Sequence, residues 1–256
     1  MKQIIRKTLR AFGYELRRVG PPPVVVPPAS PARPIGHIRM FLEDIRARGF
    51  EPRGVVDVGA NRGGWTRMAR AVFPDARVIL IEPQEEMRSL LDQLCRDYSG
   101  LEYVQAGAGS QPGQLLQTIW DDLDGSSFLP EASAEAVRAG RQRMTPIVTI
   151  DQLLAARPDF HPDLVKLDVQ GYELEVLKGA SSLFGRSEVM ILETSLYQFL
   201  PNMPVTIDCI NFMAERGYAF YDVTESLRRP LDGALGQIDL AFARVGGALH
   251  QSNRWD

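Results

Sequence analysis

From residue 37 onward, the sequence alternates short, largely apolar runs with longer amphipathic stretches. Five such runs of four to six residues lie at 54–58, 78–81, 101–106, 164–167 and 189–192. Short apolar runs separated by amphipathic helices are typical of a parallel sheet that helices cover on both faces. The sequence therefore predicts an α/β fold built on a doubly wound, Rossmann-like sheet.

The stretches between and after these runs predict the other elements. Helices are expected over 37–48, from residue 65 to the proline at 74, after residue 83, after residue 168 and near 206–216. Two more strands are expected at 219–223 and 240–243. Residues 107–150 have no strong pattern, and only 115–120 and 147–150 suggest hairpin strands around a loop rich in Gly and Ser.

Charge and proline content divide the chain into unlike parts. Residues 1–20 carry six basic side chains against one acid, a net charge of +5, and their apolar residues recur every three or four positions. This pattern predicts a basic amphipathic helix that packs on the domain, docks on a partner or lies on an anionic membrane surface. Residues 21–34 hold seven prolines and predict an extended linker.

Residues 35–256 are expected to form the main domain. Their net charge is −9, because the whole chain carries −3, residues 1–20 carry +5 and Arg33 adds +1. An acidic domain is a poor candidate for binding nucleic acid through a basic face. No apolar run approaches the ~20 residues that span a bilayer. Cys95 and Cys209 fall in apolar helical patterns, which favours buried thiols in a reducing, cytoplasmic compartment.

Polar residues or glycines follow four of the predicted strands. They are Asp57 with the glycines after it, Glu82, Asp168 and Glu193. In a doubly wound sheet, ligands bind outside the carboxyl ends of the strands, where strand order reverses. The sequence therefore predicts that these four positions meet at one crevice.

The loop GANRGG at 59–64 is typical of a site for a nucleoside cofactor. Gly59 and Gly63 permit tight turns and the close approach of a ligand, and Glu82 is placed to accept both hydroxyls of a ribose. A dinucleotide would need a glycine where Asn61 stands. Asp57 would repel pyrophosphate but can bind an amino group directly or through water, which favours S-adenosylmethionine over NAD or FAD. A strand-to-helix turn without a ligand is the remaining alternative.

Three segments resemble the FkbM family of S-adenosylmethionine-dependent methyltransferases. They are VDVGANRGG at 56–64, IEP at 81–83 and LVKLDVQGYELEVLKGA at 164–180, the last being the most specific, and Glu193 lies beyond them. The resemblance covers roughly residues 54–245. It implies the class I methyltransferase fold, with seven strands and the last antiparallel, and adds Ala60 and Pro83 to the expected cofactor site. It also implies methyl transfer to a hydroxyl of a sugar or secondary metabolite.

An acceptor hydroxyl must lose its proton, so methyl transfer to an alcohol needs a general base or a metal ion. A divalent cation is therefore possible, although the sequence offers no metal-ligand motif. The three histidines, His37, His161 and His250, lie away from the predicted crevice. The base is thus expected among the carboxylates.

Asp168 is the first candidate for the base and Glu193 the second, with capping of backbone amides as the alternative for each. Glu173 either enters the crevice from the start of a helix or complements the helix dipole. Lys166 is expected to be buried and paired with a strand-end carboxylate. Ser126 and Ser127 either touch a ligand or belong to an ordinary loop, and Trp65 is expected to pack.

The sequence as a whole predicts an O-methyltransferase that uses S-adenosylmethionine on a sugar, glycan or secondary metabolite. It is expected in the cytoplasm, either free or held at the inner face of the membrane through residues 1–20. The alternatives are an N-methyltransferase of a small amine and a non-catalytic cofactor-binding module that assembles with a partner through residues 1–34. The acceptor pocket is expected to come from 107–150 and 194–206.

Overall fold

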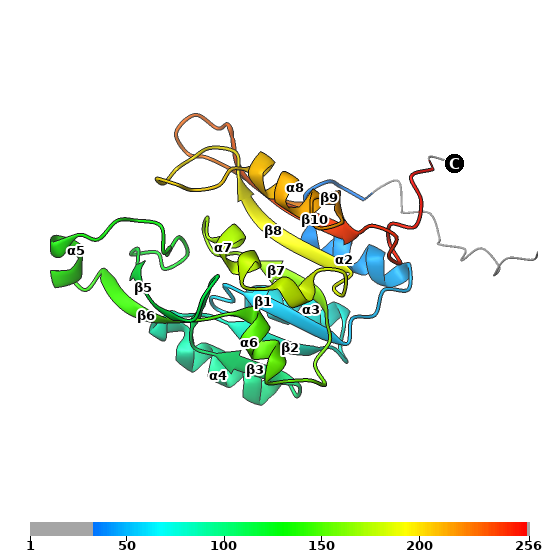
Figure 1. The fold of residues 1–256 in the computed structure, drawn as a ribbon, viewed down its shortest axis with the longest axis horizontal. Coiled ribbons are helices and arrows are strands. Elements are labelled where there is room, and N and C mark those ends of the chain that lie inside the picture. Colours follow the sequence, from blue (N-terminus) through cyan, green and yellow to red (C-terminus); the bar gives the residue numbers. More distant parts are fainter. Residues whose placement is uncertain (1–32, 255–256) are drawn as a thin grey trace, which may run out of the picture.

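A computed structural model describes residues 33–254 of the chain (Figure 1). The helix predicted for 1–20 and the linker predicted for 21–34, apart from its last two residues, lie outside the described residues. Arg33, the first described residue, forms an ion pair with Asp222 and lies over the ring of Phe41. The chain therefore enters the domain beside α2 (Ile38–Ala47) and β9 (Tyr218–Arg228).

Seven strands form the main sheet in the order β3-β2-β1-β7-β8-β10-β9. Apart from β9, they are β1 (Gly54–Val58), β2 (Arg77–Ile81), β3 (Leu101–Val104), β7 (Pro162–Leu167), β8 (Val189–Ser195) and β10 (Leu235–Arg244). The first five strands in this order are parallel, and β10 pairs antiparallel with both β8 and β9. The predicted seven-stranded sheet with its last strand antiparallel is confirmed.

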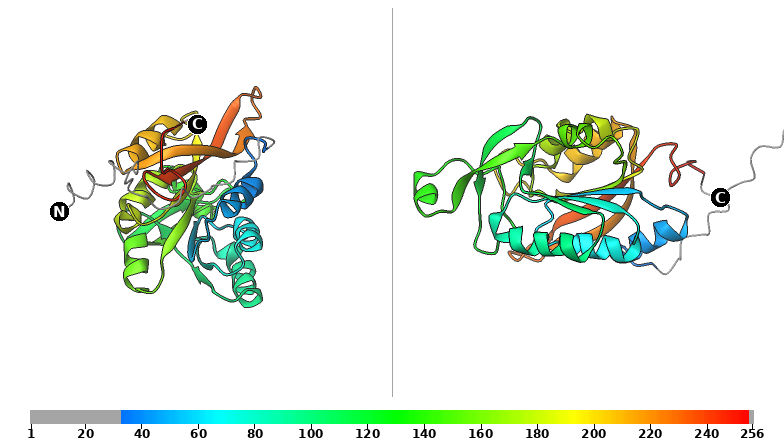
Figure 2. Two further views of the ribbon diagram at one scale, coloured as in Figure 1. Left: turned by 90° about the vertical axis from the view of Figure 1, so that its right-hand side faces the viewer. Right: turned by 90° about the horizontal axis from the view of Figure 1, so that it is seen from below.

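Helices cover both faces of this sheet, as Figure 2 shows. One face carries α2, α3 (Gly64–Val72) and α4 (Arg88–Asp97), and the other carries α6 (Ile150–Ala155), α7 (Glu173–Lys178) and α8 (Thr206–Ala214). Short 3-10 turns lie at Glu85–Met87 and Ser181–Leu183. Successive strand residues point to opposite faces, so Val55 packs toward α2–α4 and Val56 toward α6–α8. Each face thus has its own buried core.

Residues between β3 and α6 form an insert with a small sheet of its own. Its strands are β4 (Gly107–Ala108), β5 (Gly113–Thr118) and β6 (Gln142–Val148), in the order β4-β6-β5, and α5 (Ala134–Arg138) lies between β5 and β6. The antiparallel pairing of β5 with β6 confirms the predicted hairpin. In Figure 1 the insert projects from the left end of the domain.

Several predicted boundaries were wrong. Strand β6 begins at Gln142 instead of residue 147, because its buried positions include the polar Gln142 and Thr145. Strands β9 and β10 are longer than predicted, since their polar ends form a hairpin around residues 228–235. Helices α5 and α6 were not predicted at all, and both are only one or two turns long.

Two further sequence expectations concern the cysteines and the membrane. Cys209 is buried in α8 and Cys95 is half-buried on α4, and both thiols are free. Within residues 33–254, no helix combines the length and the apolar character that crossing a bilayer requires.

Candidate functional site

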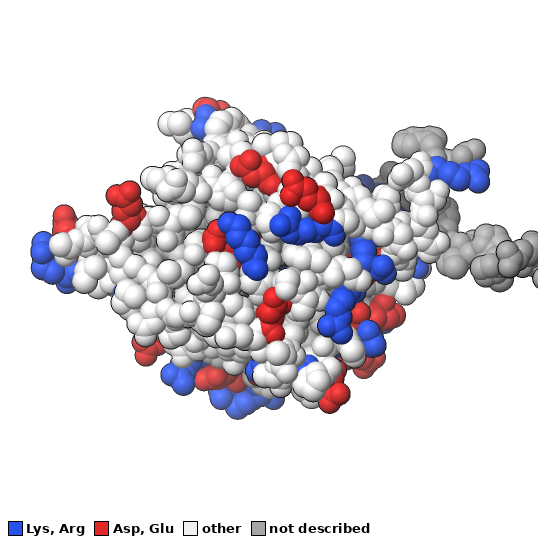
Figure 3. Space-filling model, viewed as in Figure 1, with Lys and Arg blue, Asp and Glu red and all other residues white. Residues whose placement is uncertain are grey.

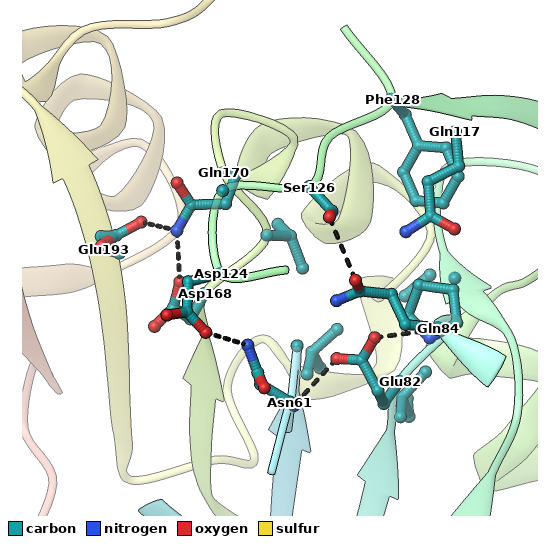
Figure 4. Close-up of a pocket in the computed structure, with 18 of the residues that line it drawn as sticks. Asn61, Glu82, Gln84, Gln117, Asp124, Ser126, Phe128, Asp168, Gln170 and Glu193 are labelled. Carbon is teal, nitrogen blue, oxygen red and sulfur yellow. Dashed lines mark hydrogen bonds between the residues drawn. The ribbon is translucent and has the colours of Figure 1, made fainter. Parts of the chain in front are cut away.

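A cavity of about 460 Å³ opens at the carboxyl ends of β1, β2, β7 and β8 (Figure 4). Glu82, Asp168 and Glu193 line it, so the structure brings together three of the four strand ends singled out by the sequence. The fourth, after β1, contributes Gly59 and Asn61. The volume lies in the range of small-molecule and cofactor sites.

The turn after β1 is built by glycine and by internal hydrogen bonds. Gly59 has a φ of 81°, and a Cβ there would lie 1.8 Å from the Asp168 carbonyl oxygen, so only glycine lets the turn pass the end of β7. The amides of Gly59 and Ala60 donate to the Ile81 carbonyl, and the Gly63 amide donates to the Ala60 carbonyl. These bonds use the amides of Gly59, Ala60 and Gly63 within the turn and fix its shape.

Glu82 is fixed at the end of β2 by two backbone amides. Its Oε2 accepts a hydrogen bond from the Asn61 amide at 2.8 Å, and its Oε1 accepts one from the Gln84 amide at 2.9 Å. The side chain is only 3% exposed, and burial raises its pKa against the effect of these bonds. Each carboxylate oxygen keeps a second lone pair, so the group can still accept two hydroxyls from the cavity. Pro83 lines the cavity beside it.

Asp57 is one of the predicted site residues that do not line the main cavity. Its side chain points to the face of the sheet that α3 covers, and there the hydroxyl of Thr66 donates a hydrogen bond to the Asp57 carboxylate. Burial raises the pKa of Asp57 to about 6 despite that bond. Together with Trp65 and Lys166, Asp57 lines an adjoining cavity that shares Gly59 and Asp168 with the main cavity but does not include Glu82. Ala60 and Gly63 also lie outside the lining of the main cavity, where they shape the turn.

Lys166 and Gln170 organise the two strand-end carboxylates. Lys166, with its side chain 3% exposed, pairs with Asp168 at 3.3 Å and with Asp239 of β10 at 3.1 Å, which confirms the predicted ion pairing. The Gln170 side-chain amide donates to Asp168 Oδ1 at 2.9 Å and to Glu193 Oε2 at 2.7 Å (Figure 4). The sequence argument missed Gln170, and the available signal was its position three residues beyond the end of β7 and just before Gly171.

The surroundings of Asp168 and Glu193 shift the pKa values of the two carboxyl groups in opposite directions. Burial disfavours the charged form of Asp168, but the adjacent Lys166 ammonium and the hydrogen bonds to the carboxylate outweigh it and lower the pKa of Asp168. Burial and the negative charge of Asp168 raise the pKa of Glu193 well above its ordinary value. Two neighbouring carboxylates with pKa values pushed apart are typical of functional sites.

Glu173 does not reach the cavity. Its Oε1 accepts hydrogen bonds from the amides of Val169 and Gly171, at 3.1 and 3.2 Å, so it supports the turn that carries Gln170. Burial raises the pKa of Glu173 to about 7. Asp168 is not a helix cap either, since the residue preceding α7 is Tyr172.

The insert closes one side of the cavity through polar contacts. Ser126 Oγ donates to Gln84 Oε1 at 3.1 Å, and the Asn61 side-chain amide donates to Asp124 Oδ1 at 2.9 Å. Phe128 adds an aromatic wall. Ser126 therefore lies at the cavity, as one of the two sequence alternatives proposed. Gln84, Asp124 and Phe128 could not be predicted from the sequence, because their partners are distant in the chain.

The remaining candidates lie away from this cavity. His37 caps α2 by accepting a hydrogen bond from the Met40 amide at 3.3 Å, and neither His161 nor His250 lines the cavity. Trp65 packs against the core on the α2–α4 side, as expected. In the part of the chain that is described, no group of three or more His, Cys, Asp or Glu side chains is placed to hold a metal ion.

The parallel sheet with antiparallel β10, and the cavity at its strand ends with a fixed acidic residue after β2, define the class I methyltransferase type of protein. A family model described as "Methyltransferase FkbM domain" matches residues 57–220, and the chain belongs to that family. The resemblance noted in the sequence is thereby confirmed.

Individual relatives agree with the family. Methyltransferase sdnD of Sordaria araneosa is 32% identical over a match that covers 49% of this chain and 59% of that protein. Methyltransferase 1 of Beauveria bassiana is 22% identical, covering 49% of this chain and 57% of its own length. The chain thus spans less than two thirds of the curated relatives that it matches. The crystal structure of Methyltransferase FkbM from Methylobacillus flagellatus is similar in fold, with a TM-score of 0.50 at 18% identity, covering 74% of this chain and 43% of that one.

Proposed function

We propose that this chain transfers a methyl group from S-adenosylmethionine to a hydroxyl of a sugar, glycan or secondary metabolite. Family membership supports methyl transfer, and Glu82 is the observation that carries the choice of cofactor. Its carboxylate is held by two backbone amides and keeps lone pairs free for the two hydroxyls of a ribose. Asn61, which stands where a dinucleotide loop needs a glycine, favours a nucleoside without pyrophosphate.

The lining of the cavity fits the cofactor. Glu82 would hold the ribose, Ala106 and Phe128 would offer apolar surface to the base, and the turn at Gly59 would lie along the amino acid tail. The bound cofactor supplies a methyl group on a positively charged sulfur, so the electrophile arrives already activated. The protein then has to hold the acceptor in line and accept its proton.

Asp168 and Glu193 are the groups that would meet the acceptor. Both line the main cavity, and both also line a smaller adjoining cavity of about 180 Å³ beneath the β9–β10 hairpin. An acceptor hydroxyl placed between the two cavities would lie beside these carboxylates. The described residues do not fit a divalent cation, because the cation beside Asp168 is the ammonium of Lys166 and no group of three or more His, Cys, Asp or Glu side chains among them is placed to hold a metal ion.

The charge pattern supports a role for residues 1–20 at a surface. Their net charge of +5 and their apolar stripe suit an anionic membrane surface or an acidic partner. We propose a cytoplasmic enzyme that is held at such a surface by this segment while residues 35–256 act on the acceptor.

Calorimetry with S-adenosylhomocysteine tests the cofactor proposal. We expect the wild type to bind and Glu82→Ala to weaken binding by at least tenfold, because hydrogen bonds to a charged group contribute about 1.5–3 kcal/mol each. Glu82→Gln keeps one acceptor oxygen, so its affinity for S-adenosylhomocysteine should lie between those of the wild type and Glu82→Ala. Glu135→Ala, which removes an exposed carboxylate of α5, should bind as the wild type does. A wild type that does not bind would reject the proposal.

The acceptor can be found by methyl labelling. The protein would be incubated with methyl-labelled S-adenosylmethionine and fractionated lysate of the host, and the labelled species identified by mass spectrometry. Label on a hydroxyl oxygen of a glycan or metabolite is expected. Label on an amine nitrogen would instead support the N-methyltransferase alternative.

A further inference from the structure

The hydrogen bonds of the two strand-end carboxylates are distributed unequally. Both oxygens of Asp168 are engaged, Oδ2 by Lys166 and Oδ1 by the side-chain amide of Gln170. In Glu193, Oε2 accepts from the same Gln170 nitrogen. No N–H or hydroxyl group of the described residues donates to Glu193 Oε1, and the Glu193 carboxyl group, which lines the cavity, also forms a hydrogen bond with that of Asp168. Glu193 is therefore the carboxylate with an oxygen left for a ligand.

The turn that carries Gln170 fixes its side chain in place. Gln170 has a φ of 53°, in the left-handed region that costs a non-glycine residue free energy. Its carbonyl oxygen accepts a hydrogen bond from Ser127 Oγ at 2.9 Å, and Glu173 binds the amides on either side of it. This support holds the two N–H bonds of one amide group toward the two carboxylates (Figure 4).

We propose that Glu193 takes the proton of the acceptor through Oε1, and that Gln170 is the positioning residue that orients it while Lys166 holds Asp168 as a permanent anion. This inference rests on the proposed methyl transfer. As the acceptor oxygen gains the methyl group, its O–H bond breaks and the proton passes to Glu193 Oε1. The electron pair of the broken carbon–sulfur bond stays on sulfur, so charge balances when Glu193 later releases the proton to water.

The charged surroundings support this division of roles. The negative charge of Asp168 faces Glu193 and favours proton uptake, whereas Lys166 opposes it, and Glu173 and Asp239 add further negative charge. Asp168 itself faces Lys166 directly, and its pKa is lowered. A carboxylate held against an ammonium is a weak base, while a buried carboxylate beside an anion is a stronger one.

Carboxyl carbon NMR of the full chain tests the proposal without an acceptor. With labelled Asp and Glu carboxyls, the two signals would be assigned by their loss in Asp168→Asn and Glu193→Gln. We expect Glu193 to titrate at a higher pH than Asp168. In Gln170→Ala the pKa of Glu193 should rise by about one unit or more, because a hydrogen bond to its charged form is lost.

Two further variants keep this test sharp. In Gln170→Asn, the asparagine suits the left-handed backbone but is too short to reach both carboxylates. The pKa of Glu193 should therefore rise as in Gln170→Ala, while the protein stays folded. Gln152→Ala, an exposed glutamine on α6 that does not line the cavity, should shift neither signal. The inference would be overturned if the pKa of Asp168 were higher than that of Glu193, or if the pKa of Glu193 were unchanged in both Gln170 variants.

A pH profile of labelled methyl transfer to the active lysate fraction supplies the kinetic test. Asp168→Asn should move the acidic limb of the activity profile, where Glu193 becomes protonated, to lower pH, since it removes the charge that raises the pKa of Glu193. Glu193→Gln should abolish transfer at every pH. Activity retained in Glu193→Gln would contradict the inference. Failure of the wild type to bind S-adenosylhomocysteine would count against the proposed function, whatever the order of the two titrations.

Discussion

At the scale of single residues, Glu173 links the stability of the site to pH. Its pKa is raised by burial from 4.5 to about 7, so between these values the folded protein holds a proton that the unfolded chain has lost. The free energy of unfolding therefore falls as pH rises through this window and levels off above it. Asp57, with a pKa raised to about 6, acts in the same direction over a lower range.

Glu173→Gln should remove this part of the pH dependence. Both backbone amides donate to one oxygen of Glu173, which a glutamine carbonyl can replace without a charge. We expect equal stability of variant and wild type near pH 4.5, and a variant more stable by about 1–3 kcal/mol at pH 8. Urea unfolding at both pH values measures this. Glu135→Gln, on an exposed part of α5, serves as the control, and a less stable Glu173→Gln at pH 8 would contradict the prediction.

The sequence identified those site residues whose position follows from strand order. Glu82, Asp168 and Glu193 end neighbouring parallel strands, so their convergence could be predicted without knowing any contact. Asp57 points toward α3 because side chains alternate along β1, and its contact with the cofactor stays a prediction. Gln84 and Gln170 were missed because an amide gains its role only from the carboxylates that it meets in three dimensions.

At the scale of elements, the loop between β5 and α5 forms a polar lid on the cavity. Leu123 is held through its carbonyl oxygen, which accepts from the Gln84 side-chain amide at 2.9 Å, and Asp124 binds both Asn61 and Arg62 of the turn after β1. These contacts are partly solvated, so each contributes little free energy. We therefore expect this loop to open when a ligand enters or leaves.

Asp124→Ala should loosen this lid. It removes the Asn61 hydrogen bond and the Arg62 ion pair together, so we expect affinity for S-adenosylhomocysteine to fall about three- to tenfold, mainly through faster dissociation. Stopped-flow measurement of both rate constants checks this. Asp121→Ala, in the same loop but outside the cavity lining, should leave the rates unchanged. A slower association rate with unchanged dissociation would argue against a lid.

The buried strands and the amphipathic helices could be predicted because their patterns are long and regular. Hydrophobic runs located β1, β2, β7 and β8 to within two or three residues. The insert could not be predicted to the same degree. Its strands are held by polar side chains such as Gln142, whose amide bonds Thr118, and by the ion pair of Arg143 with Glu86 across to the main domain. Such contacts leave no period in the sequence.

At the scale of the whole molecule, the small net charge of −3 combines two segments of opposite charge. Residues 1–20 carry +5 and residues 35–256 carry −9. On the face of the domain shown in Figure 3, acidic and basic side chains are interspersed instead of forming one basic patch. The domain alone should therefore be repelled by an anionic surface, and any attraction has to come from the amino-terminal segment.

This difference predicts how the full chain and a shortened chain behave toward vesicles. Each Lys or Arg near an anionic surface contributes about 1 kcal/mol, so the full chain should sediment with phosphatidylglycerol vesicles and deletion of residues 1–20 should reduce its partition coefficient at least tenfold. Vesicles of phosphatidylcholine alone should bind neither form, and binding should fall as salt rises. A variant with the six basic residues of this segment changed to Gln keeps the apolar stripe and isolates the charge. Equal sedimentation of the full and shortened chains would reject the membrane proposal and leave an acidic partner protein as the target of this segment.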